Sequence, residues 1–171
     1  QLELEGDGFV DVWLQGAGDA EAEQAQPYFP RGAEIAGTIG VPASAAKLIA
    51  VGCVAARTDW TDSGGVLHPV TDSARPVSSG TWCSFSSAGP APGGEFRPDL
   101  LAPGLNVIST LARTAHAQVH DLALVDAEHR ALSGTSMSSP FVAGAAALLF
   151  QLHPQLTQEE LRSLLQAGAR P

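Results

Sequence analysis

Residues 133–149 read SGTSMSSPFVAGAAALL, a glycine turn followed by a long run of small and apolar side chains. That composition is typical of a helix buried on all sides, and we predict a helix over Ser136–Leu152. The first N–H groups of a helix have no partner within it and carry partial positive charge. A hydroxyl on Ser136 would therefore lie beside donors that stabilise a developing oxyanion, as a nucleophile requires. The alternative is that Ser136 or Ser133 only caps the helix.

The composition excludes several classes of protein. The chain has 171 residues, of which 44% are hydrophobic and 16% are charged, so it is too apolar for a disordered chain and long enough for one domain. We find no run near the roughly 18 apolar residues that span a bilayer. The net charge of −9, without a basic cluster, disfavours both nucleic acid and anionic membrane surfaces as partners.

Buried strands point to an α/β protein. Residues Ala46–Ala55 read AKLIAVGCVA, a nearly continuous apolar run that predicts a strand covered on both faces. Shorter strands are predicted at Phe9–Leu14, Thr81–Ser87 and Asn106–Ala112.

Two segments are predicted to lack regular structure. Arg57–Gly80 is polar and rich in Ser, Gly, Asp and Pro, so we predict a surface loop, interpreted as an insertion, with a small hairpin around Gly64–Gly65. Ala88–Gly104 holds four prolines and four glycines and is predicted to wind irregularly across a surface.

A second helix is predicted near the C-terminus. His153 and Pro154 end the first helix, because a residue before proline avoids helical geometry. Thr157 and Glu160 then form a capping box, and the amphipathic helix that follows should stop at Gly168.

Four segments, in order, resemble the subtilisin-like serine proteases. Residues 134–149 resemble the family's nucleophile segment, GTSMA(S/T)PHVAG. RPDLLAPG (Arg97–Gly104) resembles its PD(V/L)xAPG segment, and SFSSAGP (Ser84–Pro90) its (A/S)FSSxGP segment. GVPASAAKLIAVGCV (Gly40–Val54) is similar to its proline-containing turn and buried strand.

This resemblance implies a three-layer α/β fold with a mostly parallel sheet, present only as its C-terminal portion, so that residues 1–171 form part of one peptidase domain. It implies that Ser136 attacks a peptide carbonyl to form an acyl-enzyme, with its own backbone N–H in the oxyanion hole. Gly134 and Thr135 would shape the nucleophile loop, and Gly40 would line the substrate pocket. Asp99 is expected to have a structural role, fixing backbone amides in its loop.

The order Asp, His, Ser of this family leaves two partners of Ser136 unassigned. No histidine precedes the predicted buried strand, and none has the family's His-Gly-Thr context; the five are His68, His116, His120, His129 and His153. We expect the catalytic Asp and His to lie upstream of Gln1, so that the chain alone is inactive. The alternatives are a non-catalytic pseudoprotease acting as a binding or structural module, and an unrelated hydrolase that pairs Ser136 with His116, His120 or His129.

The family's second oxyanion donor is an asparagine in an AAGN(E/D)G segment. Asp19, in Gly16-Ala17-Gly18-Asp19, could occupy that place, although a carboxylate would repel a developing oxyanion. We favour an asparagine that also lies upstream.

The resemblance suggests a structural calcium ion and no organic cofactor. Backbone carbonyls in the turn Val41–Leu48 resemble a weak cation site of the family, whereas no side-chain metal site is predicted. Cys53 and Cys83 fall in strands expected to be neighbours, so they either form a disulfide or remain two free core thiols. The family resemblance also implies a protein or peptide substrate and a secreted or extracytoplasmic location. A partial sheet should expose an edge and apolar faces, which invites self-association.

Overall fold

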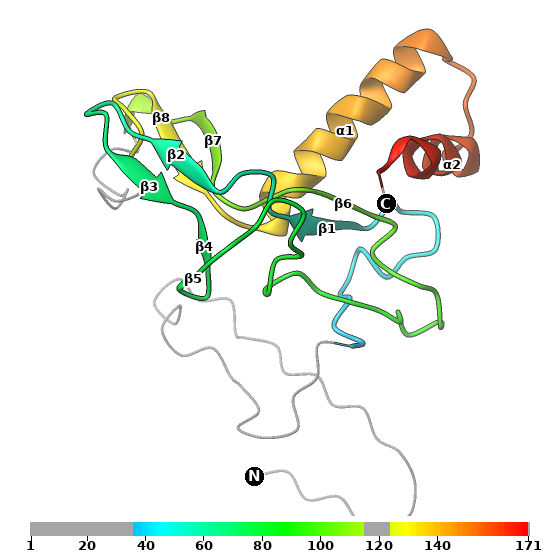
Figure 1. The fold of residues 1–171 in the computed structure, drawn as a ribbon. Helices are drawn as coiled ribbons and strands as arrows, with labels where there is room; N and C mark the ends of the chain where they lie inside the picture. Colours follow the sequence, from blue (N-terminus) through cyan, green and yellow to red (C-terminus); the bar gives the residue numbers. More distant parts are fainter. Residues whose placement is uncertain (1–35, 115–123, 171) are drawn as a thin grey trace, which may run out of the picture. The chain divides into compact units, whose positions relative to one another are not determined.

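A parallel pair of strands lies at the centre of the computed structural model, which describes residues 36–114 and 124–170. Strand β1 (Val51–Val54) pairs with β6 (Leu100–Pro103), and Cys53 lies opposite Ala102 (Figure 1). Both of these residues are buried. This confirms the predicted buried strand, although β1 is shorter than the apolar run that predicted it.

Strand β6 corrects the prediction that residues 88–104 are irregular throughout. Prolines and glycines fill the first part of the segment, but Leu100, Leu101 and Ala102 form an apolar run between Pro98 and Pro103. Pro103 is the last residue of the strand, so its missing N–H does not interrupt the hydrogen bonds between the two strands.

The strand predicted at Thr81–Ser87 is reduced to one antiparallel bridge, between Val54 and Trp82. The chain turns directly after it, because the Ser86 N–H donates to the Cys83 carbonyl at 3.0 Å. The Ser86 hydroxyl then accepts a hydrogen bond from the Cys53 N–H at 3.0 Å. The hydrogen bonds of Ser86 with Cys83 and Cys53 therefore replace the further strand pairing that was predicted here.

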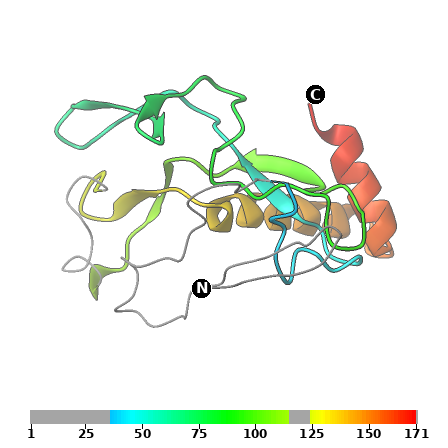
Figure 2. The same cartoon turned by 90° about the horizontal axis from the view of Figure 1, so that it is seen from below.

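Two helices follow the sheet, α1 (Thr135–Leu152) and α2 (Gln158–Gly168). Figure 2 shows α1 running along the β1–β6 pair, against which it packs. The predicted capping box is present: the Thr157 hydroxyl accepts from the Glu160 N–H, and the Glu160 carboxylate accepts from the Thr157 N–H at 2.8 Å. Both helices end where predicted, at His153 and at Gly168.

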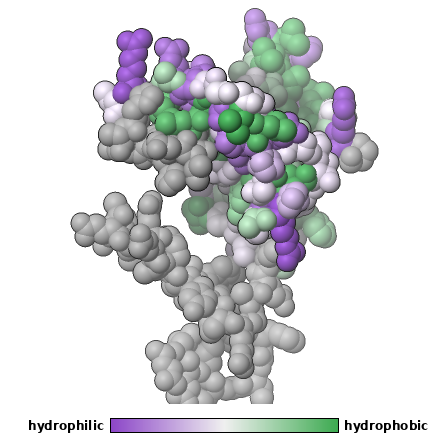
Figure 3. Space-filling model, turned by 60° about the vertical axis from the view of Figure 1, so that its left-hand side comes forward, coloured by the Kyte–Doolittle hydropathy of each residue, from purple (hydrophilic) through white to green (hydrophobic). Residues whose placement is uncertain are grey.

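Helix α1 is not buried on all sides, contrary to the prediction. Ser138 and Val142 are its buried residues, whereas Phe141, Leu148 and Leu152 are 51%, 64% and 72% exposed. One side of the helix packs against β1 and β6. Apolar side chains lie at the surface of the described part of the chain (Figure 3). Helix α1 has 18 residues and is, by length and composition alone, apolar enough to cross a membrane, which corrects the expectation that no run approaches this length. The core helix of a soluble protein passes the same test.

Three antiparallel pairs complete the described elements: β2 (Asp59–Thr61) with β3 (Leu67–Pro69), β4 (Thr71–Asp72) with β5 (Arg75–Pro76), and β7 (Val107–Thr110) with β8 (His129–Leu132). The β2–β3 hairpin turns at Gly64–Gly65 and β7 lies within Asn106–Ala112, as predicted. Trp60 and Val70 are buried in the core, so the polar segment 57–80 also contributes packing.

The described residues therefore have a mixed α/β fold in which one of four strand pairs is parallel. The mostly parallel sheet, the three layers, and the interpretation of 57–80 as an insertion remain predictions. The predicted strand Phe9–Leu14 lies outside the described residues.

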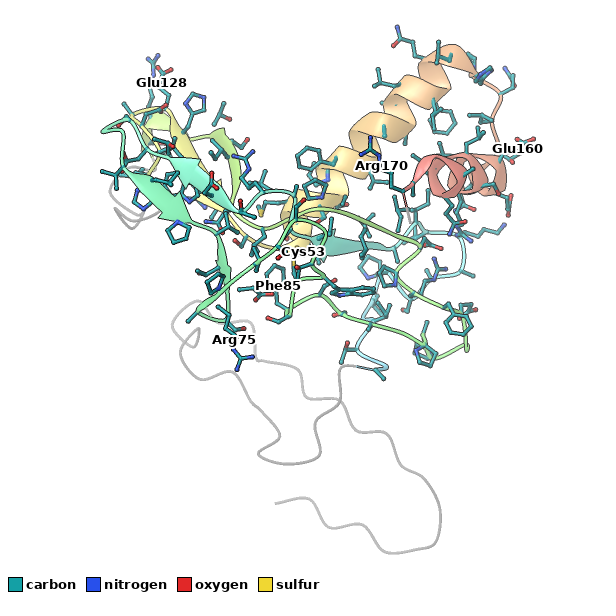
Figure 4. The ribbon with its side chains drawn as sticks, viewed as in Figure 1. Cys53, Arg75, Phe85, Glu128, Glu160 and Arg170 are labelled. Atoms are coloured by element: carbon teal, nitrogen blue, oxygen red, sulfur yellow. A yellow bond between two sulfur atoms is a disulfide. The ribbon has the colours of Figure 1, made fainter. Side chains whose placement is uncertain are left out.

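Cys53 and Cys83 form a disulfide with a Cα–Cα distance of 5.4 Å, which decides between the two sequence alternatives. Both cysteines are buried, and the Cys83 N–H also donates to the Cys53 carbonyl at 3.0 Å. Figure 4 places Cys53 close to the start of α1. The bond fixes the segment after β5 to the central strand.

Removing this disulfide should lower stability substantially. The bridge closes a loop with a sequence separation of 30, which corresponds to about 3–4 kcal/mol in the chain-entropy account. We expect the Cys53→Ala/Cys83→Ala variant to unfold at a lower urea concentration than the parent chain. Dithiothreitol should lower the parent's midpoint toward that of the variant and leave the variant unchanged; an equal effect on both would contradict the assignment.

Candidate active site

The start of α1 is an uncapped helix N-terminus. Gly134 is the N-cap residue, with φ 152° and ψ 155°, and among the described residues no side chain caps the helix. The capping alternative for Ser133 and Ser136 is therefore wrong. A φ of 152° lies in the region that favours glycine, so a side chain at Gly134 would strain this turn.

Ser136 is the second residue of α1, and it is exposed. The first turn of the helix contains no acidic residue. The positive end of the helix dipole therefore favours an anion that forms beside this hydroxyl, although the Met137 N–H already donates to the Gly134 carbonyl at 3.0 Å. Thr135, half-buried, separates Ser136 from the glycine turn. This geometry suits a nucleophile, and the role of Ser136 itself remains a prediction.

Ser133 also stabilises the turn, through hydrogen bonds with Asn106. Its hydroxyl accepts a hydrogen bond from the Asn106 N–H at 3.0 Å and donates to Asn106 Oδ1 at 3.3 Å. Asn106 has a positive φ of 48°, which asparagine tolerates better than most residues. Sequence reasoning missed this pair, because its members are 27 positions apart.

Gly104 joins the strands to the nucleophile turn. Its carbonyl accepts the Gly134 N–H at 2.8 Å, and its own N–H donates to the Val54 carbonyl at 3.3 Å. A Cβ at this position would lie 2.8 Å from both the Gly134 carbonyl oxygen and Cys53 Sγ, and would overlap the Ser138 hydroxyl. Glycine is therefore required by close approach. From the sequence alone, Gly104 could be recognised only as the last residue of the RPDLLAPG segment, and its close contacts could not be predicted.

Ser138 lies at the centre of this contact. It is fully buried, and its hydroxyl has no hydrogen-bond partner within the described ranges. Here the chain departs from the alanine of the family pattern. The extra oxygen fills the space between α1 and Gly104.

Asp99 has a structural role, as predicted, but the backbone amide that it binds is that of Ala50 and not one of its own loop. Its Oδ2 accepts the Ala50 N–H at 2.7 Å and also pairs with the Arg97 guanidinium. Both side chains of the pair are almost completely buried. Arg162 of α2 approaches Asp99 Oδ1 at 3.6 Å. The carboxylate therefore holds the start of β1, the segment before β6, and α2 together.

The histidines in the described residues have other partners. His68 Nε2 lies 2.8 Å from Asp62 Oδ2 and stacks on Trp60, and His129 Nδ1 lies 2.9 Å from Asp126 Oδ1. His153 ends α1, at the opposite end from Ser136. His116 and His120 lie outside the described residues.

Two predicted site residues remain, of which the structure describes only Gly40. Gly40 lies in the turn before β1, where its carbonyl accepts the Ser44 N–H at 3.0 Å; within residues 36–114 and 124–170, no hydrogen bond links it to Ser136. Asp19 lies outside the described residues. Over the same ranges no group of three or more His, Cys, Asp or Glu side chains could hold a metal ion.

Four carboxylates in the described part of the chain have lowered pKa values. Hydrogen bonds from the Ser84 hydroxyl and N–H lower the pKa of Asp72 below the ordinary 3.8, and the bond from His68 does the same for Asp62. The Glu128 N–H, followed by His129, lowers the pKa of Asp126. The Thr157 N–H lowers that of Glu160 in the capping box.

Comparison with known proteins is consistent with the geometry at the start of α1. The sequence matches the subtilase family, peptidase S8, over residues 15–170. The chain belongs to this family. As a subtilase, it shares 36% identity over 129 residues with the serine protease AprX of Bacillus subtilis (strain 168), which is 68% of this chain and 29% of the relative.

Two other relatives match half or more of this subtilase chain. Subtilisin E of Bacillus subtilis (strain 168) is 33% identical over 132 residues, 77% of the chain and 24% of that protein. The subtilisin-like protease SBT1.7 of Arabidopsis thaliana is 41% identical over 90 residues, 50% of the chain and 12% of its own length. The chain spans less than a third of the length of each relative.

Replacement of Gly104 by alanine should displace Ser138 and the start of α1. We expect Gly104→Ala to cost about 1–3 kcal/mol of stability through overpacking. Gly144→Ala on α1 is the matched control, because a Cβ there meets nothing within 4 Å; it should stabilise the helix by up to about 1 kcal/mol. Urea unfolding measures both. Equal effects of the two substitutions would show that Gly104 is not a close contact.

Acid should weaken the fold through the lowered pKa values. The pKa of Asp72 is lower in the folded chain than the ordinary 3.8, so its contribution is complete above that pH and is lost as the pH falls through the folded pKa. The urea midpoint should therefore drop below about pH 4, and it should drop less steeply in Asp72→Asn, which has no carboxyl to protonate. Superimposable pH profiles would rule out a contribution from Asp72.

Proposed function

We propose that this chain is the serine-bearing part of a subtilisin-like endopeptidase domain, with Ser136 as the nucleophile. The observation that carries the proposal is the exposed Ser136 hydroxyl at the uncapped N-terminus of α1, within the GTSMSSP segment. Subtilases are serine peptidases in general, so peptide bonds are the substrate class.

In the proposed reaction a histidine base removes the Ser136 proton as Oγ attacks the peptide carbonyl carbon. The carbonyl oxygen becomes an oxyanion and accepts a hydrogen bond from the Ser136 N–H, favoured by the helix dipole. Collapse of the tetrahedral intermediate returns the proton to the amine that leaves, and an acyl-enzyme remains. Water, deprotonated by the same histidine, then hydrolyses the ester and regenerates Ser136.

The catalytic His and Asp, and an asparagine as second oxyanion donor, are proposed to lie upstream of this chain. His68 and His129 are hydrogen-bonded to Asp62 and Asp126, and among the described residues neither is hydrogen-bonded to Ser136, which supports an upstream base. Asp19 stays the weaker candidate for the second donor. Gly134 and Thr135 would keep the substrate backbone close to Ser136, and Gly40 is proposed to line the substrate pocket.

The proposal also covers the location of the whole protein, self-association of the isolated chain, and calcium binding. The Cys53–Cys83 disulfide supports an extracytoplasmic location, because disulfides persist in oxidising compartments. The apolar residues exposed on α1 support self-association of the chain when it is isolated. Structural calcium would have to bind away from the turn Val41–Leu48, since guanidinium groups already donate to carbonyls there.

A pseudoprotease is the competing function. Its support is that no histidine among the described residues is hydrogen-bonded to Ser136. Such a protein would keep the fold as a binding module and would lack the Asp and His motifs in the upstream sequence. The sequence of the upstream region therefore distinguishes the two hypotheses, because only the peptidase needs the Asp and His motifs there.

A fluorophosphonate probe tests the nucleophile. The full-length protein should be labelled at Ser136, whereas the 171-residue chain should react barely above background, because the serine lacks its base. Ser136→Ala should abolish labelling, and Ser139→Ala, an exposed serine one turn further on, should retain it. Strong labelling of the isolated chain would overturn the proposed upstream base, and an unlabelled full-length protein would favour the pseudoprotease.

A further inference from the structure

We propose that the turn Val41–Leu48 is closed by the guanidinium groups of Arg97 and Arg162, which occupy the position that a structural cation would otherwise take. The family resemblance predicts backbone carbonyls of this turn as ligands of a weak calcium site. In this chain the same carbonyls face two arginines that come from distant parts of the sequence.

The carbonyls of Ala45, Ala46 and Leu48 each accept at least one hydrogen bond from a guanidinium. Arg97 Nη1 donates to Leu48 at 3.0 Å, and its Nη2 donates to Ala45 and Ala46, both at 3.3 Å. Arg162 Nη2 donates to Ala46 at 2.8 Å and to Leu48 at 3.0 Å. A metal ion could reach these oxygens only by displacing the arginine donors.

The charges at the cluster also disfavour calcium. Two guanidinium groups face one carboxylate, Asp99, so the cluster already carries one net positive charge. Arg97 and Asp99 are 2% and 7% exposed, and water therefore screens the site poorly. A Ca²⁺ ion at the roughly 2.4 Å that oxygen ligands require would lie beside both cations. The residues present do not fit a divalent cation at this turn.

Arg162 extends the cluster to the C-terminal helix. It projects from α2, and Gln166, one turn further on, donates to the Asp99 carbonyl at 3.1 Å. The planar fork of arginine lets one side chain bond two carbonyls and approach Asp99 together, which the point charge of lysine does less well. The turn, β1, β6 and α2 are thereby joined without a metal.

The proposal is independent of the nucleophile, because it concerns the turn and not Ser136. Its test is local: hydrogen exchange of the backbone amides in residues 44–50, where Ser44, Ala45, Leu48 and Ala50 donate to acceptors within the cluster or the turn. The sample is the full-length protein, inactivated by Ser136→Ala so that it cannot cleave itself, in calcium chloride and in EGTA.

We expect exchange of residues 44–50 to agree within about twofold between calcium and EGTA, because no cation holds the turn. Arg162→Ala should speed exchange about tenfold or more in both solutions, and Arg162→Lys should restore only part of the protection. Arg75→Ala, an exposed arginine on the β4–β5 hairpin (Figure 4), is the charge-matched control and should leave this segment unchanged.

Two results would overturn the proposal. One is a loss of protection over residues 44–50 in EGTA in the protein with both arginines intact, which would mean that a cation holds the turn. The other is an Arg162→Ala protein whose exchange in this segment is unchanged. The first measurement requires no arginine substitution, so it decides the matter even if the Arg162 variant fails to fold.

Discussion

The hydrogen bond between the Gly134 N–H and the Gly104 carbonyl is the interaction on which the rest of the structure depends. Gly104 also donates to Val54, at the end of β1, and directly follows β6. One residue without a side chain thus connects both parallel strands to the start of α1. This main-chain hydrogen bond helps to set the position of Ser136, together with the hydrogen bonds between Ser133 and Asn106.

Features encoded by neighbouring residues could be predicted from sequence. The capping box of α2 needs only Thr157 and Glu160, and both of its hydrogen bonds are present. The buried strand was visible because its apolar side chains are consecutive. The start of α1 could be predicted for the same reason, since the glycine turn, Ser136 and the helix form one continuous segment.

Features that depend on distant residues could not be predicted. Strand β6 was hidden by the prolines around it, and only pairing with β1 shows that Leu100–Pro103 is extended. The exposure of α1 could not be predicted, because the sequence of an apolar helix does not show whether other elements cover it. Arg162 contacts carbonyls 114 and 116 positions away, a distance at which sequence patterns carry no information about pairing.

The disulfide has a further consequence for a protein that belongs to a family of peptidases. Between Cys53 and Cys83 lie two exposed hairpin turns, at Gly64–Gly65 and at Ser73–Ala74, and exposed turns are preferred points of proteolytic nicking. A single cut in this interval leaves both pieces attached through the sulfur atoms. Such a nicked molecule would migrate as one species until it is reduced, and its strands β1 and β6 would remain paired beside the serine turn.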